Sequence, residues 1–282
     1  MIVLCDQYAW MKLLDPKLTE KVIFFDINNF KDETMQLKPL YQTYYWLDIT
    51  RIYKNYGFYM LQSLDKKYVI PTYGPNDIHQ IHHGHKWILK PITGARTVGV
   101  MIVEASDVFK ICLSPDLFES EDTFFDYCKE HNIDIFKKDA YKSYIYETYK
   151  DKHFIIQPFL ENVKEEYRLY VGFDGEPFEY CIERPVPYLN KRNKEESRIA
   201  VLRYNFMNDI ANNVIKRFIK LTGKHYPFVS VDILVTDDEK AYIVDYGIEF
   251  SFINFTKEAH ILESFKEWLN KKLNQKLEEL YS

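Results

Sequence analysis

The stretch at 153–171, HFIIQPFLENVKEEYRLYV, constrains the fold more than any other part of the chain. Two apolar runs with the composition of β-strands flank a polar middle, and the first run stops at a Gln-Pro, because proline cannot donate to a sheet ladder. In the second run Glu166 and Arg168 alternate with apolar and aromatic residues, so the two charged side chains lie on one face of the strand. That face is either plain solvent surface or the floor of a site for a charged ligand.

The composition is that of an ordinary globular protein, since 46% of the 282 residues are hydrophobic and 28% are charged. The length suits one large domain or two smaller ones. The formal net charge is -5. No feature of the sequence demands the basic face of a nucleic-acid-binding protein, so no nucleic-acid partner is expected.

The cysteines and the apolar runs indicate the compartment. The cysteines are far apart and form no CxxC pair, which argues against a zinc site and for a reducing environment. They are Cys5, Cys112, Cys128 and Cys181. No apolar run reaches about 18 residues, and the N-terminal MIVLCDQYAW has no basic leader, so neither a membrane span nor a signal peptide is expected. We therefore expect a cytoplasmic protein without membrane contact.

Strand-like and helix-like segments are mixed along the chain, which predicts an α+β protein. Residues 86–91 (KWILKP) predict a strand, and 92–105 predict a turn of small residues and a second strand, which together form a hairpin. Residues 228–250 predict another hairpin around the polar turn TDDEK. Residues 1–85 mix short apolar runs with turn signals and predict a small α/β cap.

Two helices are predicted in the first half of the chain. Residues 38–57 could form a helix that Gly57 closes. A second helix would begin near Pro115, because a serine followed by proline fits an N-cap with proline at the first helical position.

Two more helices are predicted in the second half. Residues 208–222 predict a helix that Asn208 or Asp209 caps and Gly223 follows. The C-terminal segment is amphipathic, and its apolar face packs on the core or, alternatively, binds a partner. The apolar residues of this segment that fall in register are Ile261, Phe265, Trp268 or Leu269, Leu273, Leu277 and Leu280.

A loop of small residues follows a strand that ends in a lysine, in LKPITGARTVGV. Gly94 and Gly99 let backbone N–H groups approach an anion closely, and Lys90 and Arg96 add positive charge. These residues suit a polyphosphate, although the loop is not a Walker A sequence because it lacks GK[ST]. The alternative is an ordinary hairpin with a solvated arginine.

The strand end Gln-Pro-Phe-Leu offers backbone groups that suit the edge of an adenine. Three glutamates that follow are candidates to contact ribose: Glu161, Glu165 and Glu166. Arg168 lies on one strand and Arg184 ends the next. Two arginines on neighbouring strands suit a phosphoryl group, because a guanidinium binds such oxygens in pairs. The alternative is a Glu–Arg ladder on the sheet surface.

Acidic residues stand inside the apolar strands of the 228–250 hairpin. Asp232 lies in VSVDILV and Asp245 in YIVDYGIEF, with Glu249 four residues later. Buried carboxylates are costly unless they are paired or bind a cation. A hairpin that places Asp232 beside Asp245 would make a Mg²⁺ site. The alternative is that each aspartate ends a strand or pairs with a lysine or arginine.

The order of these features resembles the ATP-grasp superfamily. It runs from a lysine strand with a small-residue loop, through an adenine-hinge strand, a Glu-x-Arg strand and an arginine strand, to a carboxylate hairpin. The closest resemblance is to the carboxylate–amine ligase branch, which includes glutamate-ligase-like enzymes and D-alanine–D-alanine ligase. It covers residues 86–254. It implies the ATP-grasp fold, in which two α/β subdomains, here 86–160 and 161–282, clasp ATP after the short cap at 1–85.

The resemblance also implies roles for individual residues. Arg168 and Arg184 would stabilise the transferring phosphoryl group. The nucleotide would be bound through Lys90, Gly94, Arg96 and Gly99 at its phosphates, Gln157, Phe159 and Leu160 at adenine, and Glu165 or Glu166 at ribose. Mg²⁺ would be held by Asp232, Asp245 and Glu249.

The chain departs from the family pattern at the carboxylate hairpin. Asp245 stands where the family usually has glutamate, and Gly247 stands where the family has an asparagine that binds metal. Glu249 could replace that ligand through a shifted backbone. Lys66 and Lys67 are both candidates for the first nucleotide-binding lysine of the family.

The reaction that the resemblance implies is the ATP-dependent joining of a carboxylate to an amine through an acyl-phosphate, including at a peptide or protein end. Arg198 and Arg203 would then grip an acidic substrate, unless they belong to a solvated loop. A non-catalytic ATP-binding module is the alternative that Gly247 favours, and phosphoryl transfer to another acceptor is a third. The histidines of HQIHHGH fit a solvated loop, substrate contacts or metal ligands; they are His79, His82, His83 and His85.

Overall fold

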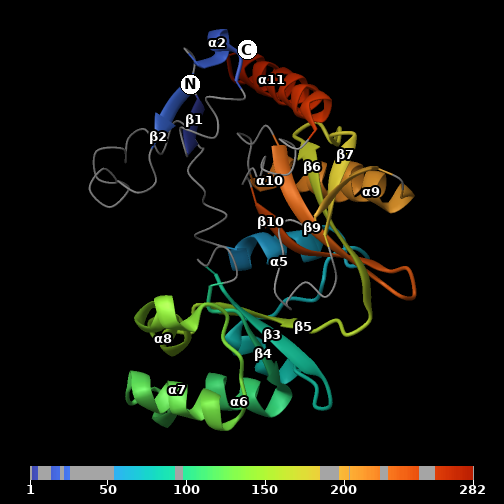
Figure 1. Ribbon diagram of the computed structural model, residues 1–282. Coiled ribbons are helices and arrows are strands. Elements are labelled where there is room, and N and C mark those ends of the chain that lie inside the picture. The colour runs from blue at the N-terminus through green and yellow to red at the C-terminus, as the bar shows by residue number, and fades with distance from the viewer. Residues whose placement is uncertain are drawn as a thin grey trace. The chain divides into compact units, whose positions relative to one another are not determined.

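The computed structural model groups the chain into two compact units (Figure 1). One unit is Thr50–Glu161, and the other combines Met1–Ile49 with Asn162–Ser282. The described residues are 2–5, 14–19, 22–25, 54–92, 98–184, 197–202, 204–222, 228–247 and 258–281. Helices are mixed with antiparallel sheets, which confirms the predicted α+β class. The division at 85/86 and 160/161 stays a prediction, since residues 50–85 group here with 86–161.

The unit Thr50–Glu161 contains a three-stranded antiparallel sheet in the order β4-β3-β5. Its strands are β3 (Lys86–Pro91), β4 (Met101–Glu104) and β5 (Phe154–Pro158). The predicted hairpin of β3 and β4 is therefore confirmed. β5 lies at the edge of the sheet, where a proline costs no ladder hydrogen bond if its nitrogen faces outward.

Residues of α6 (Ala105–Leu113), α7 (Glu121–Glu130) and α8 (Lys142–Lys150) belong to the apolar core around this sheet. The unit also contains α5 (Lys54–Leu64) and the 3₁₀ turns η2 (Pro75–Gln80), η3 (Pro115–Phe118) and η4 (Lys138–Ala140). The rings of Phe124 and Tyr149 stack at 5.9 Å, and Tyr149 packs on Phe154 at 4.9 Å. These aromatic contacts join α7 and α8 to β5.

Two predicted helix boundaries in this unit are wrong. Gly57 lies inside α5 and does not end it. Pro115 opens only a 3₁₀ turn, and the α-helix begins at Glu121, because Ser120 accepts a hydrogen bond from the Thr123 amide at 3.1 Å and caps it. Residues 38–53 lie outside the described part of the chain.

The other unit contains a five-stranded antiparallel sheet in the order β10-β9-β6-β7-β8. Its strands are β6 (Val163–Gly172), β7 (Tyr180–Arg184), β8 (Arg198–Val201), β9 (Phe228–Thr236) and β10 (Ala241–Gly247). β9 and β10 confirm the predicted second hairpin. The unit also contains a parallel pair, β1 (Ile2–Cys5) with β2 (Val22–Phe25), and α2 (Pro16–Thr19).

One face of the five-stranded sheet is apolar and packs on a helical segment made of α9 (Asn205–Asp209), the π-helical η6 (Ile210–Ile215) and α10 (Lys216–Thr222). The ring of Tyr167 lies 5.8 Å from that of Tyr204, and Tyr246 lies 5.2 Å from Phe218. The segment starts at Asn205, so the predicted caps at Asn208 and Asp209 are wrong: Asp209 has helical backbone angles.

The C-terminal helix α11 (Ala259–Tyr281) packs on one end of the opposite face. Tyr170 lies 5.4 Å from Phe265, and Phe228 lies 6.1 Å from Trp268, between ring centroids. The predicted apolar register is confirmed, since these residues are buried: Ile261, Phe265, Trp268, Leu269, Leu273 and Leu277. The side chain of Leu280 lies outside the described residues.

Ion pairs fasten α11 to the turn between β6 and β7. The fully buried ammonium of Lys272 donates to Asp174 and to Glu176, the latter at 2.6 Å. Gly172 leaves room for the Lys272 side chain, because a Cβ there would lie 2.8 Å from Lys272 Cε.

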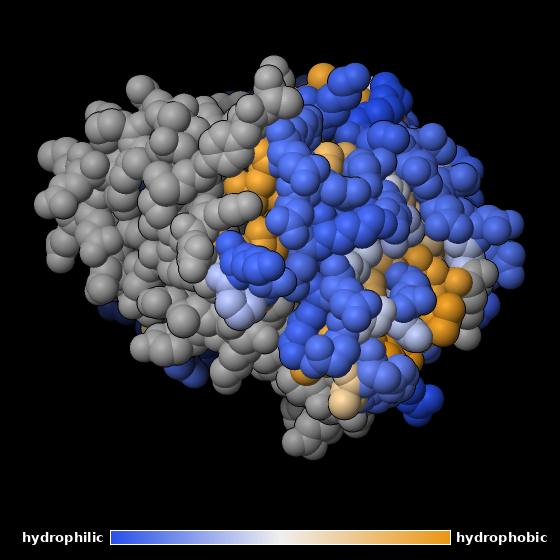
Figure 2. Space-filling model, turned by 90° about the horizontal axis from the view of Figure 1, so that it is seen from above, coloured by the Kyte–Doolittle hydropathy of each residue, from blue (hydrophilic) through white to orange (hydrophobic). Residues whose placement is uncertain are grey.

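Polar residues cover most of the described surface in the view of Figure 2, with smaller apolar areas between them. Among the helices the structure describes, none is long and apolar enough to cross a membrane.

Candidate active site

The helix α11 covers one end of a face of the five-stranded sheet. Charged residues occupy the other end of the same face. Arg168 on β6 pairs in register with Asp232 on β9, and Glu166 pairs with Arg184 on β7. The exposed side-chain fraction is 0% for Glu166, 3% for Asp232, 10% for Arg184 and 17% for Arg168. Alternation along β6 therefore does not mark plain solvent surface. It places four charged groups in a nearly buried cluster.

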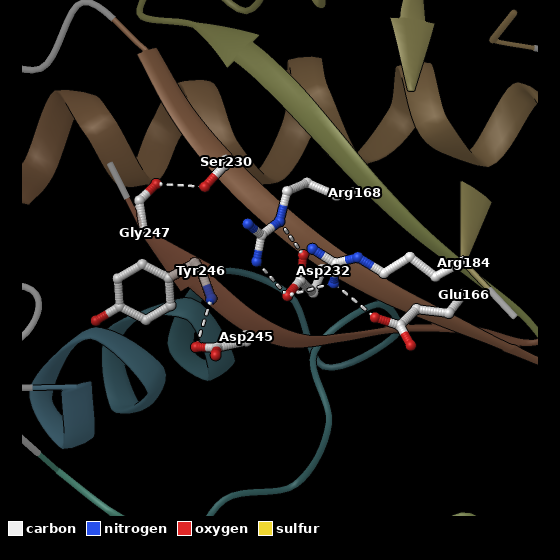
Figure 3. A network of polar contacts seen from close by, with 8 residues as sticks. All are labelled: Glu166, Arg168, Arg184, Ser230, Asp232, Asp245, Tyr246 and Gly247. Atoms are coloured by element: carbon white, nitrogen blue, oxygen red, sulfur yellow. Dashed lines mark hydrogen bonds and ion pairs between the residues drawn. The ribbon is translucent and has the colours of Figure 1, made fainter. Parts of the chain in front are cut away.

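Both guanidinium groups converge on one carboxylate (Figure 3). Arg168 donates from Nε to Asp232 Oδ1 at 2.6 Å and from Nη2 to Oδ2 at 2.7 Å. Nη1 of Arg184 donates to Glu166 Oε1 at 2.7 Å and lies 3.1 Å from Asp232 Oδ2. Such paired, charge-assisted contacts are the strong ones among protein hydrogen bonds. The predicted phosphoryl-binding arginines thus lie together, as the sequence led us to expect.

The two arginines stay charged in this cluster. Burial alone lowers the pKa of Arg168, but the charge of Asp232 and its hydrogen bonds outweigh burial and raise the pKa above its ordinary value. The pKa of Arg184 is raised in the same way, with burial opposed mainly by Asp232. A pair of permanent positive charges on a sheet face is suited to bind an anion.

A β-bulge brings Asp245 opposite Asp232. The register of β9 and β10 shifts between Ile243 and Asp245, so the extra residue, Val244, leaves Asp245 paired with Asp232. The prediction that the hairpin places these two aspartates beside each other is confirmed. Asp245 Oδ1 accepts a hydrogen bond from the Tyr246 amide at 2.9 Å, and the Gly247 carbonyl accepts one from Ser230 Oγ at 3.0 Å.

The described residues do not make a complete Mg²⁺ site as they are arranged. Both oxygens of Asp232 bind arginine, and Gly247 has no side chain to offer. Within the ranges that the structure describes, no three His, Cys, Asp or Glu side chains gather as metal ligands. That statement includes the exposed histidines His79, His82, His83 and His85, whereas Glu249 lies outside the described residues. Magnesium binding therefore stays a prediction.

A second bulge separates the two glutamates that the sequence could not distinguish. The register of β6 with β9 shifts between Val163 and Glu165. Glu165 accepts hydrogen bonds from Tyr167 at 2.9 Å and from Tyr204 at 2.8 Å, on the face that packs against α9. Glu166 lies on the opposite face, with Arg184. Both carboxylates thus have protein partners, and the third candidate, Glu161, is exposed.

The predicted phosphate-binding residues lie in the other unit, around β3. Lys90 is half-buried and pairs in register with Ile155 of β5. Gly99 has a backbone φ of +72°, which a residue with a side chain rarely adopts. Gly94 and Arg96 lie outside the described residues. The hydroxyl of Tyr149 contacts the carbonyl oxygens of Gly99 at 2.7 Å and Leu89 at 3.2 Å, a link for which the sequence offered no signal.

The predicted adenine residues lie at the end of β5. Gln157 is fully buried, and its Nε2 donates to Thr72 Oγ1 at 2.9 Å. Gln157 Oε1 is buried and has no hydrogen-bond partner among the described residues. Phe159 and Leu160 are half-buried, and the Phe159 amide donates to the Lys86 carbonyl at 2.9 Å. A buried acceptor without a donor suits an incoming N–H group.

Other predicted ligand residues remain at the surface. Arg198 is exposed on β8, opposite Glu183. Arg203 lies outside the described residues. Lys66 and Lys67 are both exposed, and Lys67 Nζ lies 2.6 Å from the Tyr68 hydroxyl, so the structure does not choose a nucleotide lysine between them.

Comparisons of the sequence find no matching family model and no matching curated protein. Solved structures do match. D-cycloserine synthetase DcsG has a TM-score of 0.60 at 13% identity, covering 96% of this chain and 99% of that one. Macrocyclase MdnC from Microcystis aeruginosa MRC, bound with precursor peptide MdnA, has a TM-score of 0.54 at 11% identity, covering 95% and 99%. D-alanine–D-alanine ligase from Bacillus anthracis has a TM-score of 0.53 at 13% identity, covering 99% and 100%.

These likenesses extend over almost the whole length of each chain. They show that the chain has the fold of ATP-grasp ligases, as the resemblance in the sequence led us to expect. At such low identity the likeness concerns the fold, and the activity has to be argued from the site itself.

Proposed function

We propose that the chain is an ATP-dependent carboxylate–amine ligase that acts through an acyl-phosphate, with a peptide or protein end as one substrate. The observation that carries this proposal is the buried pair Arg168 and Arg184 on the sheet face of an ATP-grasp fold. Two guanidinium groups held side by side suit the oxygens of a transferring phosphoryl group. The peptide substrate is supported by the fold likeness to MdnC, which was solved with a precursor peptide.

The reaction has two steps. A carboxylate oxygen of the first substrate attacks the γ-phosphorus of ATP, the bond to the β-phosphate oxygen breaks, and ADP leaves. The amine nitrogen of the second substrate then attacks the acyl carbon, and phosphate leaves with the oxygen that joined it to the acyl group. The amine loses a proton, and an amide remains. Protein contributes positioning and charge stabilisation in such phosphoryl transfers.

The unit Thr50–Glu161 would bind the nucleotide. The orphaned oxygen of Gln157 fits a nucleotide, because the exocyclic amine of adenine would supply the missing donor. Lys90 and Gly99 would contact phosphate, as the resemblance implies. The ribose contact stays among Glu161, Glu165 and Glu166, since the hydrogen bonds described for Glu165 and for Glu166 use one carboxylate oxygen of each. Related support is the fold likeness to a D-alanine–D-alanine ligase solved with ATP, at a TM-score of 0.51.

A divalent cation would assist the transfer by neutralising phosphate charge. The described side chains do not fit one as they stand, because Asp232 is bonded to two arginines, and no step above depends on it.

The test is acceptor-dependent release of ADP. Purified protein, ATP and Mg²⁺ are incubated with peptides that carry free carboxylates, with and without an amine partner, and the products are weighed by mass spectrometry. The proposal expects ADP release that requires both substrates and a product lighter than their sum by one water. ATP binding without ADP release across many acceptor pairs would contradict it.

That contrary outcome would favour a non-catalytic ATP-binding module. Gly247 and the arginine-bound Asp232 are the observations in favour of this alternative. Such a module would bind ATP by calorimetry and turn over none.

A further inference from the structure

Asp232 binds arginine through both of its carboxylate oxygens. Nε and Nη2 of Arg168 donate to Oδ1 and Oδ2 at 2.6 and 2.7 Å, and Nη1 of Arg184 lies 3.1 Å from Oδ2. A two-point contact fixes the plane of a guanidinium as well as its position. Asp232 therefore orients Arg168 fully and Arg184 in part, with Glu166 completing the hold on Arg184 at 2.7 Å.

Each carboxylate in contact with the arginines already has a positive partner. Glu166 and Asp232 face two guanidinium groups, and all four side chains are at most 17% exposed. A divalent cation on Asp232 would lie next to two positive charges in a poorly solvated place, where repulsion is strong. The position that should supply a further ligand is Gly247, whose carbonyl already accepts from Ser230.

The side chains of the cluster differ in exposure. The side chain of Arg168 is 17% exposed and that of Asp232 only 3% exposed. A guanidinium has five N–H groups, and Asp232 uses two of those on Arg168. Arg168 is therefore the more accessible of the two side chains and keeps N–H groups beyond those that Asp232 uses. Asp245, the register partner of Asp232, accepts a hydrogen bond from the amide of Tyr246 in Figure 3.

We propose that Asp232 is a positioning residue, which holds Arg168 and Arg184 for the anionic phosphate group of a nucleotide and is not a ligand of a divalent cation. The inference rests on the proposed function, which supplies the phosphate group. It differs from the assignment that the family resemblance implies for this carboxylate.

The change in ATP affinity on loss of Asp232, measured with and without Mg²⁺, separates a positioning residue from a cation ligand. ATP is titrated by calorimetry with EDTA and with Mg²⁺, on the wild type, on Asp232→Asn and on Asp238→Asn. Asp238 is the control, because it is an aspartate of the same hairpin, with a side chain 57% exposed. If Asp232 positions arginines, its loss weakens ATP binding about 10-fold or more in both buffers, and the ratio between buffers stays that of the wild type.

A cation ligand would behave differently. Removing a negative charge near the triphosphate would strengthen or leave unchanged the binding of metal-free ATP, and weaken only binding with Mg²⁺. That result would overturn the inference while the proposed function stands. A wild type that binds no ATP in either buffer would instead overturn the proposed function, and the inference with it.

A second variant keeps the test decisive if Asp232→Asn unfolds. Arg168→Gln with Asp232→Asn removes both partners, so that no unbalanced charge is left buried between them. The inference expects any further loss of ATP binding in this double variant, relative to Arg168→Gln alone, to be the same with EDTA and with Mg²⁺, since Asp232 acts through the two arginines that it holds. A further loss in the double variant that appears only with Mg²⁺ would refute it. Circular dichroism confirms that each variant is folded.

Discussion

Arg168 combines two demands that few side chains meet. Its guanidinium fork is held by Asp232 at two points, and three of its five N–H groups are not used in that contact. A lysine would keep the charge, but it has no plane to be fixed and no second donor at a set distance. Geometry and charge can therefore be separated experimentally at this residue.

Arg168→Lys should lower the turnover of ADP release about 100-fold, since loss of one preorganised contact to a transferring group often costs about 3 kcal/mol. Initial rates at saturating ATP measure the effect. Arg217→Lys, an exposed arginine on α10, is the matched control and should keep the wild-type rate. Equal rates in both variants would remove Arg168 from the reaction.

A second prediction at the scale of single residues concerns Gln157. Gln157→Leu removes the orphaned Oε1 and should weaken ATP binding about 3- to 10-fold, the value of one ordinary hydrogen bond. Thr72→Val is the control, because it removes the partner of Nε2 and keeps Oε1. Calorimetry should show the larger loss in Gln157→Leu. The reverse order would indicate that Gln157 serves the core alone.

At the scale of elements, one hydroxyl of α8 joins β3 to the segment that leads into β4. Burial raises the pKa of Tyr149 well above its ordinary value, so the group remains a donor. Tyr149→Phe leaves the Leu89 and Gly99 carbonyls without this contact and should lower the free energy of unfolding by about 1–3 kcal/mol. Urea unfolding measures the change. Tyr141→Phe, at an exposed residue, should change it little.

The pairing of α11 with the β6–β7 turn should depend on pH. Hydrogen bonding to Lys272 lowers the pKa of Glu176 below its ordinary value of 4.5. A lowered carboxylate pKa stabilises the fold above the ordinary value, and this stability is lost as the pH falls through the lower, folded value. Glu176→Gln should therefore lower the melting temperature at pH 7. The free energy of unfolding should fall by less than about 1 kcal/mol, because the carboxylate is half exposed. The difference in melting temperature between the wild type and Glu176→Gln should vanish in acid. A difference that stays constant with pH would exclude the ion pair as its cause.

The elements that the sequence predicts well are those with a long, regular pattern. The apolar register of α11 and the alternation of β9 and β10 each extend over many residues, so local errors cancel. Helix starts were harder, because Ser120 and Asn205 lie only a few residues from other plausible starts. The order of the site residues could be predicted for the same reason as the strands that carry them.

Bulges explain what the pattern missed at the site. A residue inserted into one strand moves every following side chain to the other face. The register shift before Glu165 decides which of two adjacent glutamates meets Arg184, and no residue of the sequence marks it. The partners of Asp232 were equally hidden, since a cation and an arginine satisfy a buried carboxylate alike.

At the scale of the molecule, each unit has its own core. Buried residues between Ile81 and Ile156 form one apolar cluster inside Thr50–Glu161. We predict that a fragment of residues 50–161 folds alone and unfolds cooperatively, with dispersed amide signals in NMR spectra. The fragment 162–282 is the comparison and should be less stable, because its unit also includes Met1–Ile49. A disordered 50–161 fragment would show that the cluster depends on the other unit.

The discontinuous unit has a consequence for synthesis on the ribosome. The Asp15 amide donates to the side chain of Asn270, 255 positions later, at 2.8 Å. At translation rates of roughly 5–20 residues per second, the N-terminal segment waits roughly 13–50 seconds for that partner. The residues of Thr50–Glu161 emerge during this interval and can fold first. The nascent chain therefore carries an early segment whose native neighbours are made last, and this segment is where a chaperone would have time to bind.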